Sequence, residues 1–274
     1  MSDNGVPMEQ IKSAMRATWM AGDFGMVAKT IAAPADGFVS QLPVTSGIRA
    51  LDVATGTGNV ALPLARRGAV VTGLDLVPDL LRQARERAAA EGLQIQFDEG
   101  DAEAMPYADA SFDLVTTMFG AMFAPRPALV AAELARVLKA GGTLAMGNWN
   151  PASFTGKMFR VGAKHVPPPP GIAPPVLWGD PATVTERLFP YFTHIETAIQ
   201  PIEFHFSDSP AAAVAFFREY FGPTKMAFSR LDAAGQAALQ ADLEALWAGE
   251  NVSDDPEHRT LINNEYLLVK ATRS

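Results

Sequence analysis

The sequence predicts an α/β fold, in which a doubly wound, mostly parallel sheet of seven strands carries an N-terminal helical lid and a C-terminal cap insertion. Three observations lead to this prediction. Apolar runs of strand length alternate with amphipathic helical patterns between residues 48 and 147, as in repeated βαβ units. A glycine turn, Gly56-Thr57-Gly58, follows the first of these runs. Two further apolar runs near the C-terminus are separated by helical patterns, and we expect them to complete the sheet.

The five strands expected in the core are short, and most are rich in β-branched or aromatic residues. They cover residues 48–53, 69–74, 94–98, 112–117 and 143–147. A first helix starts near Asn59, with Pro63 in its first turn, where a missing N–H group costs little. A second helix covers about 79–91 and stops at Gly92, and a third covers about 127–139 and ends at Gly141-Gly142.

The segments that flank this core have a different pattern. Apolar residues between positions 8 and 42 suit one or two helices, which would form the lid. Prolines at 167–170 form a stiff connector that fits neither a regular helix nor a central strand. Capping residues followed by proline predict helices that open at Asp180-Pro181 and Ser209-Pro210. A strand over 194–206, a helix over 232–247 and a last strand over 265–272 complete the chain.

We expect these parts to form one domain. Residues 1–47 would be the lid and residues 48–150 the core. Residues 151–263 would form the cap with a late strand, and residues 264–274 the terminal strand. With 274 residues and 48% hydrophobic composition, the chain is long enough to bury a large core.

Composition excludes several classes of protein. The formal net charge of -8 and a pI near 5.0 argue against general binding to nucleic acid phosphates. The chain has no cysteine, and its histidines do not show a zinc spacing, so no metal site is expected. The first residues lack the features of a signal peptide, and no apolar run reaches the roughly 20 residues that span a bilayer. We therefore expect a soluble cytoplasmic protein.

The glycine turn carries the main functional signal. Gly56 and Gly58 permit backbone angles that a side chain would forbid, and the following helix offers unpaired N–H groups to a ligand. Together with Ala61 they satisfy the G-x-G-x-x-G/A dinucleotide fingerprint, and Asp75 ends the second strand, where a carboxylate can bind both ribose hydroxyls. The same geometry serves any adenosyl ligand, so these residues leave the cofactor open.

Longer motifs favour one cofactor. Residues 51–61, which read LDVATGTGNVA, resemble motif I of class I S-adenosylmethionine-dependent methyltransferases. Segments downstream resemble further motifs of this family in the same order, namely GLD at 73–75, GDAEAMPY at 100–107 and SFDLV at 111–115. VLKAGG at 137–142 is similar to the RVLKPGG turn of the ubiquinone and menaquinone biosynthesis-like members, the methyltransferase type 11 group, with Ala140 at the usual proline. The resemblance covers about residues 46–150 and implies a Rossmann-like fold with a cofactor-binding core.

The resemblance also implies which residues bind S-adenosylmethionine. Ala54, Gly56 and Gly58 would border its methionine and ribose parts, and Asp75 would hold the ribose hydroxyls. Asp101 is expected to accept a hydrogen bond from the adenine amino group. Asp52 would either orient the turn or reach the ammonium group through water. The full set of expected cofactor residues is Asp52, Ala54, Gly56, Thr57, Gly58, Asp75, Leu76, Asp101, Ala102 and Met118.

The segment after the fourth strand, TMFGAMF at 117–123, is apolar. It lacks the Asn or Asp-Pro-Pro-aromatic motif of enzymes that methylate nucleic acid amino groups, and the chain lacks the cysteine that carbon-5 cytosine enzymes need. The remaining kind of acceptor is a small molecule. The residues expected to bind it, for which core packing is the alternative role, are Phe119, Met122, Trp149, Trp178 and Tyr220.

The sequence thus predicts methyl transfer from S-adenosylmethionine to an oxygen, nitrogen or carbon atom of a small, partly apolar metabolite by in-line displacement. A sulfonium methyl group is already activated, so positioning can supply most of the catalysis. If the acceptor needs a base, His165 or His205 would supply it. Two alternatives stay open: an NAD(P)-dependent oxidoreductase and a noncatalytic, S-adenosylmethionine-binding regulatory protein. Neither nucleic acid nor membrane is expected as a partner, and a homodimer is left open.

Overall fold

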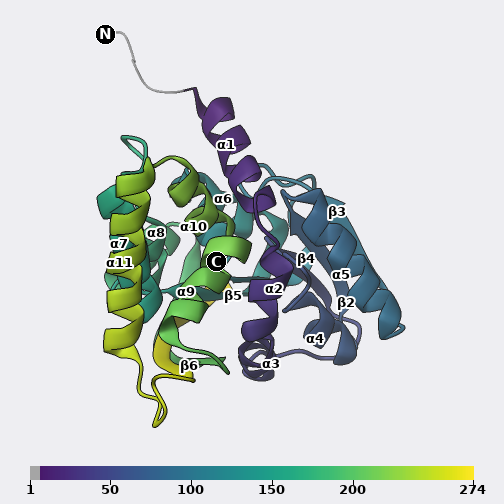
Figure 1. Ribbon diagram of the computed structural model, residues 1–274. Coiled ribbons are helices and arrows are strands. Elements are labelled where there is room, and N and C mark those ends of the chain that lie inside the picture. Colours follow the sequence, from purple (N-terminus) through teal and green to yellow (C-terminus); the bar gives the residue numbers. More distant parts are fainter. Residues whose placement is uncertain (1–6) are drawn as a thin grey trace, which may run out of the picture.

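The computed structural model describes residues 7–274, and one sheet runs through its centre (Figure 1). Its strands are β1 (Arg49–Val53), β2 (Val70–Asp75), β3 (Ile95–Glu99), β4 (Phe112–Met118), β5 (Leu138–Trp149), β6 (Phe192–Phe206) and β7 (Thr260–Arg273). They are ordered β3-β2-β1-β4-β5-β7-β6, and β7 alone runs in the direction opposite to the other six strands. The predicted seven-stranded, mostly parallel sheet is confirmed.

Three helices connect the parallel strands: α4 (Ala61–Arg66), α5 (Pro78–Ala90) and α6 (Pro127–Val137). The crossovers from β1 to β2 and from β2 to β3 build the sheet in one direction, and the crossover from β4 to β5 builds it in the other. Because such crossovers are right-handed, α4 and α5 cover one face and α6 covers the opposite face. The direction reverses between β1 and β4, so a crevice opens at the carboxyl ends of these two strands.

The prediction for the third helix is wrong at its C-terminal end. α6 ends at Val137, and β5 begins at Leu138 instead of residue 143. Leu138 pairs with Phe112 and Thr143 pairs with Leu114, so residues 139–142 bulge out of the strand. Gly141 has a φ of 75°, which a glycine adopts without steric cost, and this residue allows the bulge.

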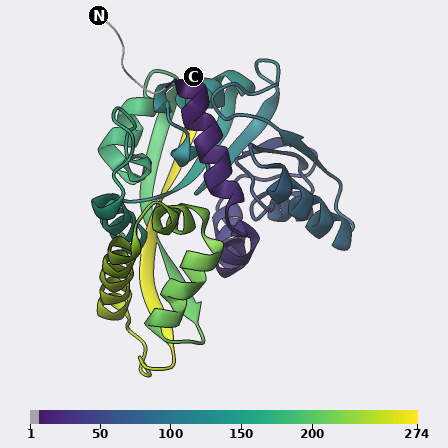
Figure 2. The same ribbon diagram turned by 45° about the horizontal axis from the view of Figure 1, so that its top comes forward.

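Three helices, not one or two, precede the sheet: α1 (Met8–Met20), α2 (Phe24–Thr30) and α3 (Ala32–Ser40). The side chain of Asp23 caps α2 by accepting a hydrogen bond from the Gly25 N–H at 3.0 Å. Ile31, with a non-helical φ of -118°, separates α2 from α3, and β-branched residues such as Ile31 are weak helix formers. Both ribbon views place α1 and α2 between the core helices and the cap (Figures 1 and 2).

The cap comes from two insertions around β6. The first contains α7 (Phe154–His165), the short 3-10 helix η2 (Pro175–Gly179) and α8 (Pro181–Leu188), and the second contains α9 (Pro210–Tyr220), α10 (Gly222–Ser229) and α11 (Ala233–Glu250). The predicted helix starts at Asp180 and Ser209 are confirmed, since both side chains cap their helices. The helices α7 and α10 were not predicted, because glycine and β-branched residues weaken their helical pattern.

Strands β6 and β7 extend beyond the rest of the sheet. The pairing of β5 with β7 stops at Trp149 and Tyr266, whereas β6 and β7 stay paired as far as Phe206 and Thr260. The result is a two-stranded ribbon that projects from the sheet and supports cap helices (Figure 2). Trp247 of α11 packs against Phe206 of this ribbon, with ring centroids 5.7 Å apart.

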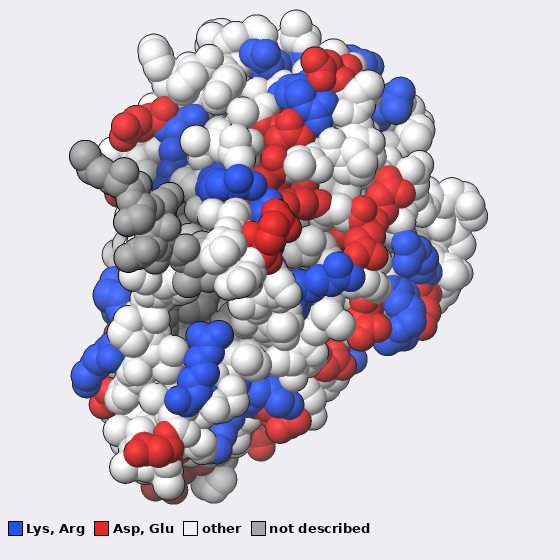
Figure 3. Space-filling view, turned by 90° about the horizontal axis from the view of Figure 1, so that it is seen from above, with Lys and Arg blue, Asp and Glu red and all other residues white. Residues whose placement is uncertain are grey.

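Charged side chains of both signs are mixed on the surface seen from above (Figure 3). Ion pairs occur in several parts of the described chain: Arg16 of α1 lies 2.6 Å from Glu99, and Arg66 of α4 lies 2.7 Å from Glu91. Within residues 7–274, no helix is long and apolar enough to cross a membrane.

Candidate active site

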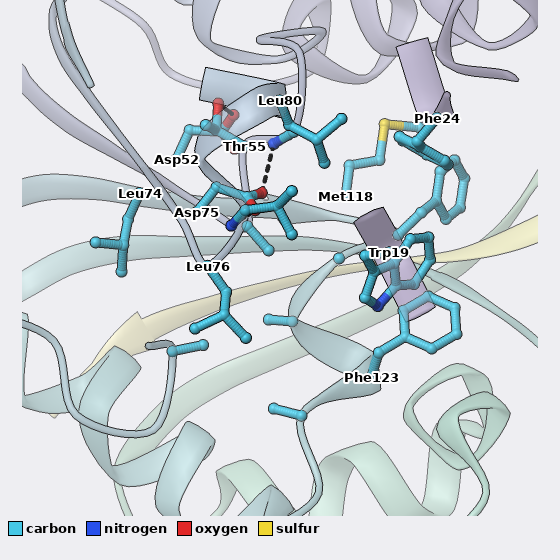
Figure 4. A pocket seen from close by; sticks show the side chains of 18 of the residues that line it. Trp19, Phe24, Asp52, Thr55, Leu74, Asp75, Leu76, Leu80, Met118 and Phe123 are labelled. Atoms are coloured by element: carbon cyan, nitrogen blue, oxygen red, sulfur yellow. Dashed lines mark hydrogen bonds between the residues drawn. The ribbon is translucent and has the colours of Figure 1, made fainter. Parts of the chain in front are cut away.

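A deep cleft lies at the carboxyl ends of β1, β2, β3 and β4 (Figure 4). It holds about 1130 Å³ of empty space, counted out to its open mouth. Figure 4 shows Asp52, Asp75 and Leu76 at one end of the cleft and the aromatic rings of Trp19 and Phe123 at the other. We call this space the main cleft.

The turn after β1 adopts the strained shape that its glycines permit. Ala54, Gly56 and Gly58 have φ angles of 55°, 55° and 83°. A Cβ atom added to Gly56 would meet the Phe24 ring at 3.8 Å, across the main cleft, so any side chain here would fill space meant for a ligand. Gly58 does not line the main cleft. A Cβ atom there would lie 2.5 Å from Leu62 Cδ1, so this glycine serves packing against α4.

Two side chains hold the glycine turn from behind. Arg87 of α5 donates hydrogen bonds to the Thr57 carbonyl oxygen and to Asn59 Oδ1, both at 2.7 Å. Asn59 in turn donates from Nδ2 to the carbonyl oxygen of Ala28 in α2, at 2.8 Å. The turn is therefore fixed both to the core and to the lid, so its shape is set before a ligand arrives.

Asp75 is the buried carboxylate at the end of β2. One of its oxygens accepts the Gly56 N–H at 2.8 Å, and the other accepts the Val77 N–H at 2.9 Å. Burial raises the pKa of Asp75 to about 6, although these N–H groups act in the opposite direction. Each carboxylate oxygen keeps a free lone pair, so Asp75 can still accept hydrogen bonds from two ligand hydroxyls in the main cleft.

Asp52 lies deeper, at the end of β1. It accepts hydrogen bonds from the hydroxyl groups of Thr55 at 2.6 Å and Thr116 at 2.9 Å. Burial raises the pKa of Asp52 to about 7. The bond from Thr55, which belongs to the turn, supports the turn-orienting role, and Asp52 also lines the main cleft.

Asp101, after β3, lines the main cleft together with Ala102 and meets the lid there. Its carboxylate is paired with the ammonium group of Lys12 in α1, and its other oxygen accepts the Glu103 N–H at 2.8 Å. Lys12 also lies 2.7 Å from the fully buried carboxylate of Glu103. Burial alone would lower the pKa of Lys12, but its bonds to Asp101 and Glu103 raise it overall. The lid is thus locked to the core beside a residue expected to bind adenine.

A second cavity adjoins the main cleft beyond Phe119. Phe119 has a φ of 60°, and its ring stacks on Trp149 with centroids 3.7 Å apart and planes 4° apart. This stacking holds a residue that is not glycine in a strained conformation, which is typical of functional sites. We call the second cavity the aromatic chamber. It is lined by Trp19, Phe24, Val27, Thr30, Ile31, Phe119, Phe123, Trp149, Thr155, Met158, Phe159, Phe204, Phe217 and Phe221.

Most of the residues expected to bind the cofactor come together in the main cleft. Of that set, Asp52, Ala54, Gly56, Thr57, Asp75, Leu76, Asp101, Ala102 and Met118 line it, and Gly58 does not. Phe119 and Trp149 line the aromatic chamber, as expected for acceptor-binding residues.

Three of the expected acceptor-binding residues lie elsewhere. Met122 and Trp178 are core residues, each at most 2% exposed, and neither lines a cavity beside the main cleft. The guanidinium group of Arg187 covers the Trp178 ring at 4.7 Å. Tyr220 packs on Phe216 outside both cavities, with ring centroids 5.0 Å apart. Their aromatic or apolar character reflects packing, which was the alternative role.

The two histidines expected as bases lie outside both cavities. His165 Nε2 lies 2.8 Å from Asp242 of α11, and His205 Nε2 lies 2.9 Å from Glu203 on an exposed part of β6. Neither is within reach of a ligand that occupies the main cleft, so neither is placed to act as a base. The described residues also contain no group of three His, Asp or Glu side chains that could hold a metal ion.

Sequence reasoning missed the contribution of the lid to the site. Its apolar residues gave a signal for a lid, but nothing in the sequence showed that Lys12 reaches Asp101 or that Asn59 reaches α2. The lid residues that line the main cleft are Lys12, Met15, Trp19, Phe24, Ala28, Ile31 and Ala35.

Comparison with known proteins agrees with this geometry. The model of the methyltransferase domain family matches residues 51–146, the segment that builds the main cleft. Demethylmenaquinone methyltransferase of Deinococcus radiodurans is 44% identical over 124 residues, which are 44% of this chain and 52% of that protein. The chain belongs to the class I S-adenosylmethionine-dependent methyltransferases. The family model matches this chain only in the core. The match to the Deinococcus protein spans about half of that protein's length.

Other relatives of this methyltransferase resemble the whole chain. The uncharacterized protein Rv1405c of Mycobacterium tuberculosis is 34% identical over 268 residues, which cover 97% of this chain and 96% of that protein. The crystal structure of YcgJ from Bacillus subtilis has a TM-score of 0.58 at 17% identity and covers 88% of this chain and 98% of YcgJ, which supports the fold. The lid and cap are therefore shared with full-length relatives, not appended to the methyltransferase core.

The methyltransferase uses S-adenosylmethionine, and the main cleft fits this cofactor. The fit rests on the space at Gly56, which a Cβ atom would fill as far as the Phe24 ring, on a buried carboxylate at Asp75 and on apolar side chains beside it, Leu76 and Leu80. The nicotinamide and noncatalytic alternatives are not favoured by the family. When bound, the cofactor supplies a methyl group on a positively charged sulfur that an acceptor lone pair can displace.

Proposed function

We propose that this methyltransferase acts on a small, partly apolar metabolite, to which it adds a methyl group at oxygen, nitrogen or carbon by in-line displacement. The observation that carries the proposal is the aromatic chamber, which adjoins the main cleft and shares the rings of Trp19, Phe24, Phe119 and Phe123 with it. A ligand in the chamber would therefore lie next to a cofactor in the main cleft. Counted out to its opening, the chamber encloses at most about 430 Å³, which is too little for a polymer.

The proposed assignment of cofactor residues follows from their positions. Asp75 accepts the ribose hydroxyl groups with its free lone pairs, and Gly56 lets the cofactor approach the turn. Asp101 and the backbone N–H of Ala102 bind adenine, and Leu76 packs on its ring. These assignments are supported by the common cleft that the residues line and by the hydrogen bonds that fix Asp75.

The chain's own contribution to the reaction is positioning and the exclusion of water. Aromatic rings close the chamber on several sides, including Phe159 and Phe221, which lie stacked with centroids 6.4 Å apart. No side chain that could act as a base lines the chamber among the described residues. An acceptor that is already nucleophilic at neutral pH, held in line with the methyl group, needs no base from the protein.

The proposal is tested by incubating the protein and methyl-labelled S-adenosylmethionine with a small-molecule extract of its source cells. We expect one labelled product, and its identification gives the acceptor and the methylated atom. Asp75→Ala is the matched control, because it removes the proposed ribose contact and should reduce labelling at limiting cofactor. If label passes only into protein or nucleic acid added to the reaction, the small-molecule proposal is wrong.

A further inference from the structure

Two residues with a hydroxyl group, Thr30 and Thr155, line the aromatic chamber. Thr155, in the first turn of α7, lines the chamber and is 3% exposed. Its Oγ1 accepts a hydrogen bond from Asn264 Nδ2 at 2.8 Å. The side chain of Asn264 is itself oriented, because its Oδ1 accepts the Thr155 N–H at 3.4 Å. With Asn264 donating to it, the Thr155 hydroxyl keeps its own proton for another partner.

No partner for that proton is present among the described residues. The other hydroxyl group in the chamber, that of Thr30, differs in this respect. Thr30 donates its proton to the carbonyl oxygen of Val27 in α2, at 2.7 Å. Thr155 therefore offers a hydrogen-bond donor to a ligand, while Thr30 has already used its donor within a helix.

The rest of the chamber restricts the ligand further. No charged side chain lines it, so a charged group brought there would lose its hydration without gaining a partner. Most of the lining residues are aromatic, including the stacked pair Phe119 and Trp149, and aromatic rings pack well against a flat ring.

We propose that the chamber binds an uncharged ring compound through an oxygen atom that accepts the proton of Thr155, and that Asn264 positions the hydroxyl for this bond. The proposal names the acceptor class and so rests on the proposed function. Thr155 would determine specificity by contact, and Asn264 would be a positioning residue that acts through Thr155.

The test uses three probes of one size. Acetophenone carries an oxygen that can only accept, ethylbenzene has the same shape without that oxygen, and benzoate is charged. Dissociation constants are measured by ligand-detected NMR titration on the full chain saturated with S-adenosylhomocysteine. We expect acetophenone to bind roughly three- to tenfold more tightly than ethylbenzene, the range for one neutral hydrogen bond, and benzoate to bind more weakly than both.

Four variants test whether the preference for acetophenone over ethylbenzene depends on the hydroxyl group of Thr155. Thr155→Val should bring the acetophenone to ethylbenzene ratio to about one without weakening ethylbenzene, and Thr155→Ser should keep the wild-type ratio. Thr30→Val is the matched control and should also keep it. Asn264→Asp should lower the ratio, because a carboxylate would take the Thr155 proton for itself.

The proposal is overturned if the wild-type protein does not distinguish acetophenone from ethylbenzene, if the preference survives in Thr155→Val, if benzoate binds best, or if no probe binds. Failure of the proposed function is read separately. It would appear as the absence of a labelled small molecule in the extract experiment, which uses none of these probes.

Discussion

At the scale of single residues, Asp75 and Ala54 show how the main cleft is prepared for its cofactor. Asp75 is buried and held by two backbone N–H groups, so it points into the cleft at the cost of a raised pKa. Ala54 occupies a left-handed conformation that glycine adopts more easily. Asp75 ends β2 and Ala54 directly follows β1, and the properties of both residues lead to predictions that can be measured.

The raised pKa of Asp75 predicts how cofactor binding depends on pH. With a pKa of about 6 in the free protein, Asp75 is ionised at pH 7.5 and mostly protonated at pH 5. A proton on this carboxyl group removes acceptor capacity for the ribose, so binding competes with protonation. We expect the Kd of S-adenosylhomocysteine, measured by calorimetry, to rise about tenfold from pH 7.5 to pH 5. Asp75→Asn should bind more weakly at pH 7.5 and show a flatter profile; an equally steep profile would assign the dependence to another group.

The conformation of Ala54 predicts a stabilising substitution. Its φ of 55° strains an alanine but not a glycine. Ala54→Gly should therefore raise the free energy of unfolding by about 0.5 to 1 kcal/mol, after the greater flexibility of glycine in the unfolded chain is subtracted. Urea denaturation measures the change. Ala50→Gly, in the buried part of β1, is the control and should destabilise the protein, because that residue has ordinary strand geometry.

At the scale of elements, the lid helix α1 is joined to the core by few but well-buried contacts. Lys12 reaches Asp101 and the buried carboxylate of Glu103, and Trp19 packs edge-on against Phe123 with centroids 5.0 Å apart. Arg16 forms a more exposed ion pair with Glu99. Since residues of α1 line the main cleft, we expect loosening of these contacts to speed the release of the cofactor.

Lys12→Met is expected to loosen α1 without removing its apolar packing. The substitution leaves Asp101 and Glu103 without this partner, and hydrogen exchange of the amides in 8–20 should become faster by about tenfold, with faster release of S-adenosylhomocysteine. Arg16→Met is the comparison, and its effect should be small because exposed ion pairs contribute little. Equal effects of the two substitutions would contradict the role given to Lys12.

The elements also show where sequence reasoning succeeds. Asp180 and Ser209 predict helix starts because a cap and a proline act within one turn of the chain. Most residues expected to bind the cofactor line one cleft for the same reason, since motif I places strand, turn and carboxylate at fixed short intervals. The start of β5 was missed because Leu138 pairs with Phe112, a distant partner that forces strand geometry on a helical pattern. Lys12 and Thr155 were missed because their roles depend on partners far along the chain.

At the scale of the whole molecule, lid, sheet and cap share one hydrophobic core. Buried residues form a continuous cluster from Val27 in the lid through Leu114 in the sheet to Trp247 in the cap. A continuous core predicts one cooperative unfolding transition, as expected for a single domain. The single-domain organisation is tested by the same experiment that tests the cofactor.

S-adenosylhomocysteine should stabilise the whole molecule as one unit. At a ligand concentration of about 100 times Kd, the folded state gains about 2.7 kcal/mol, which raises the melting temperature by roughly 5 to 10 °C for a chain of this size. Calorimetry should show one transition that moves as a whole, and NAD at the same concentration should leave it unchanged. Two separate transitions, with only one of them moved by the ligand, would show that the cap folds independently.

The ribbon formed by β6 and β7 has a consequence for how such enzymes diversify. The segment between these strands leaves at Phe206 and returns at Thr260, which are paired neighbours. A replacement segment would need only to begin and end at that spacing to be accommodated. Phe217 and Phe221 of the chamber wall belong to this segment, whereas Asp75 and the glycine turn do not. Over evolutionary time the enzyme can therefore exchange one wall of the aromatic chamber while it inherits the residues of the main cleft unchanged.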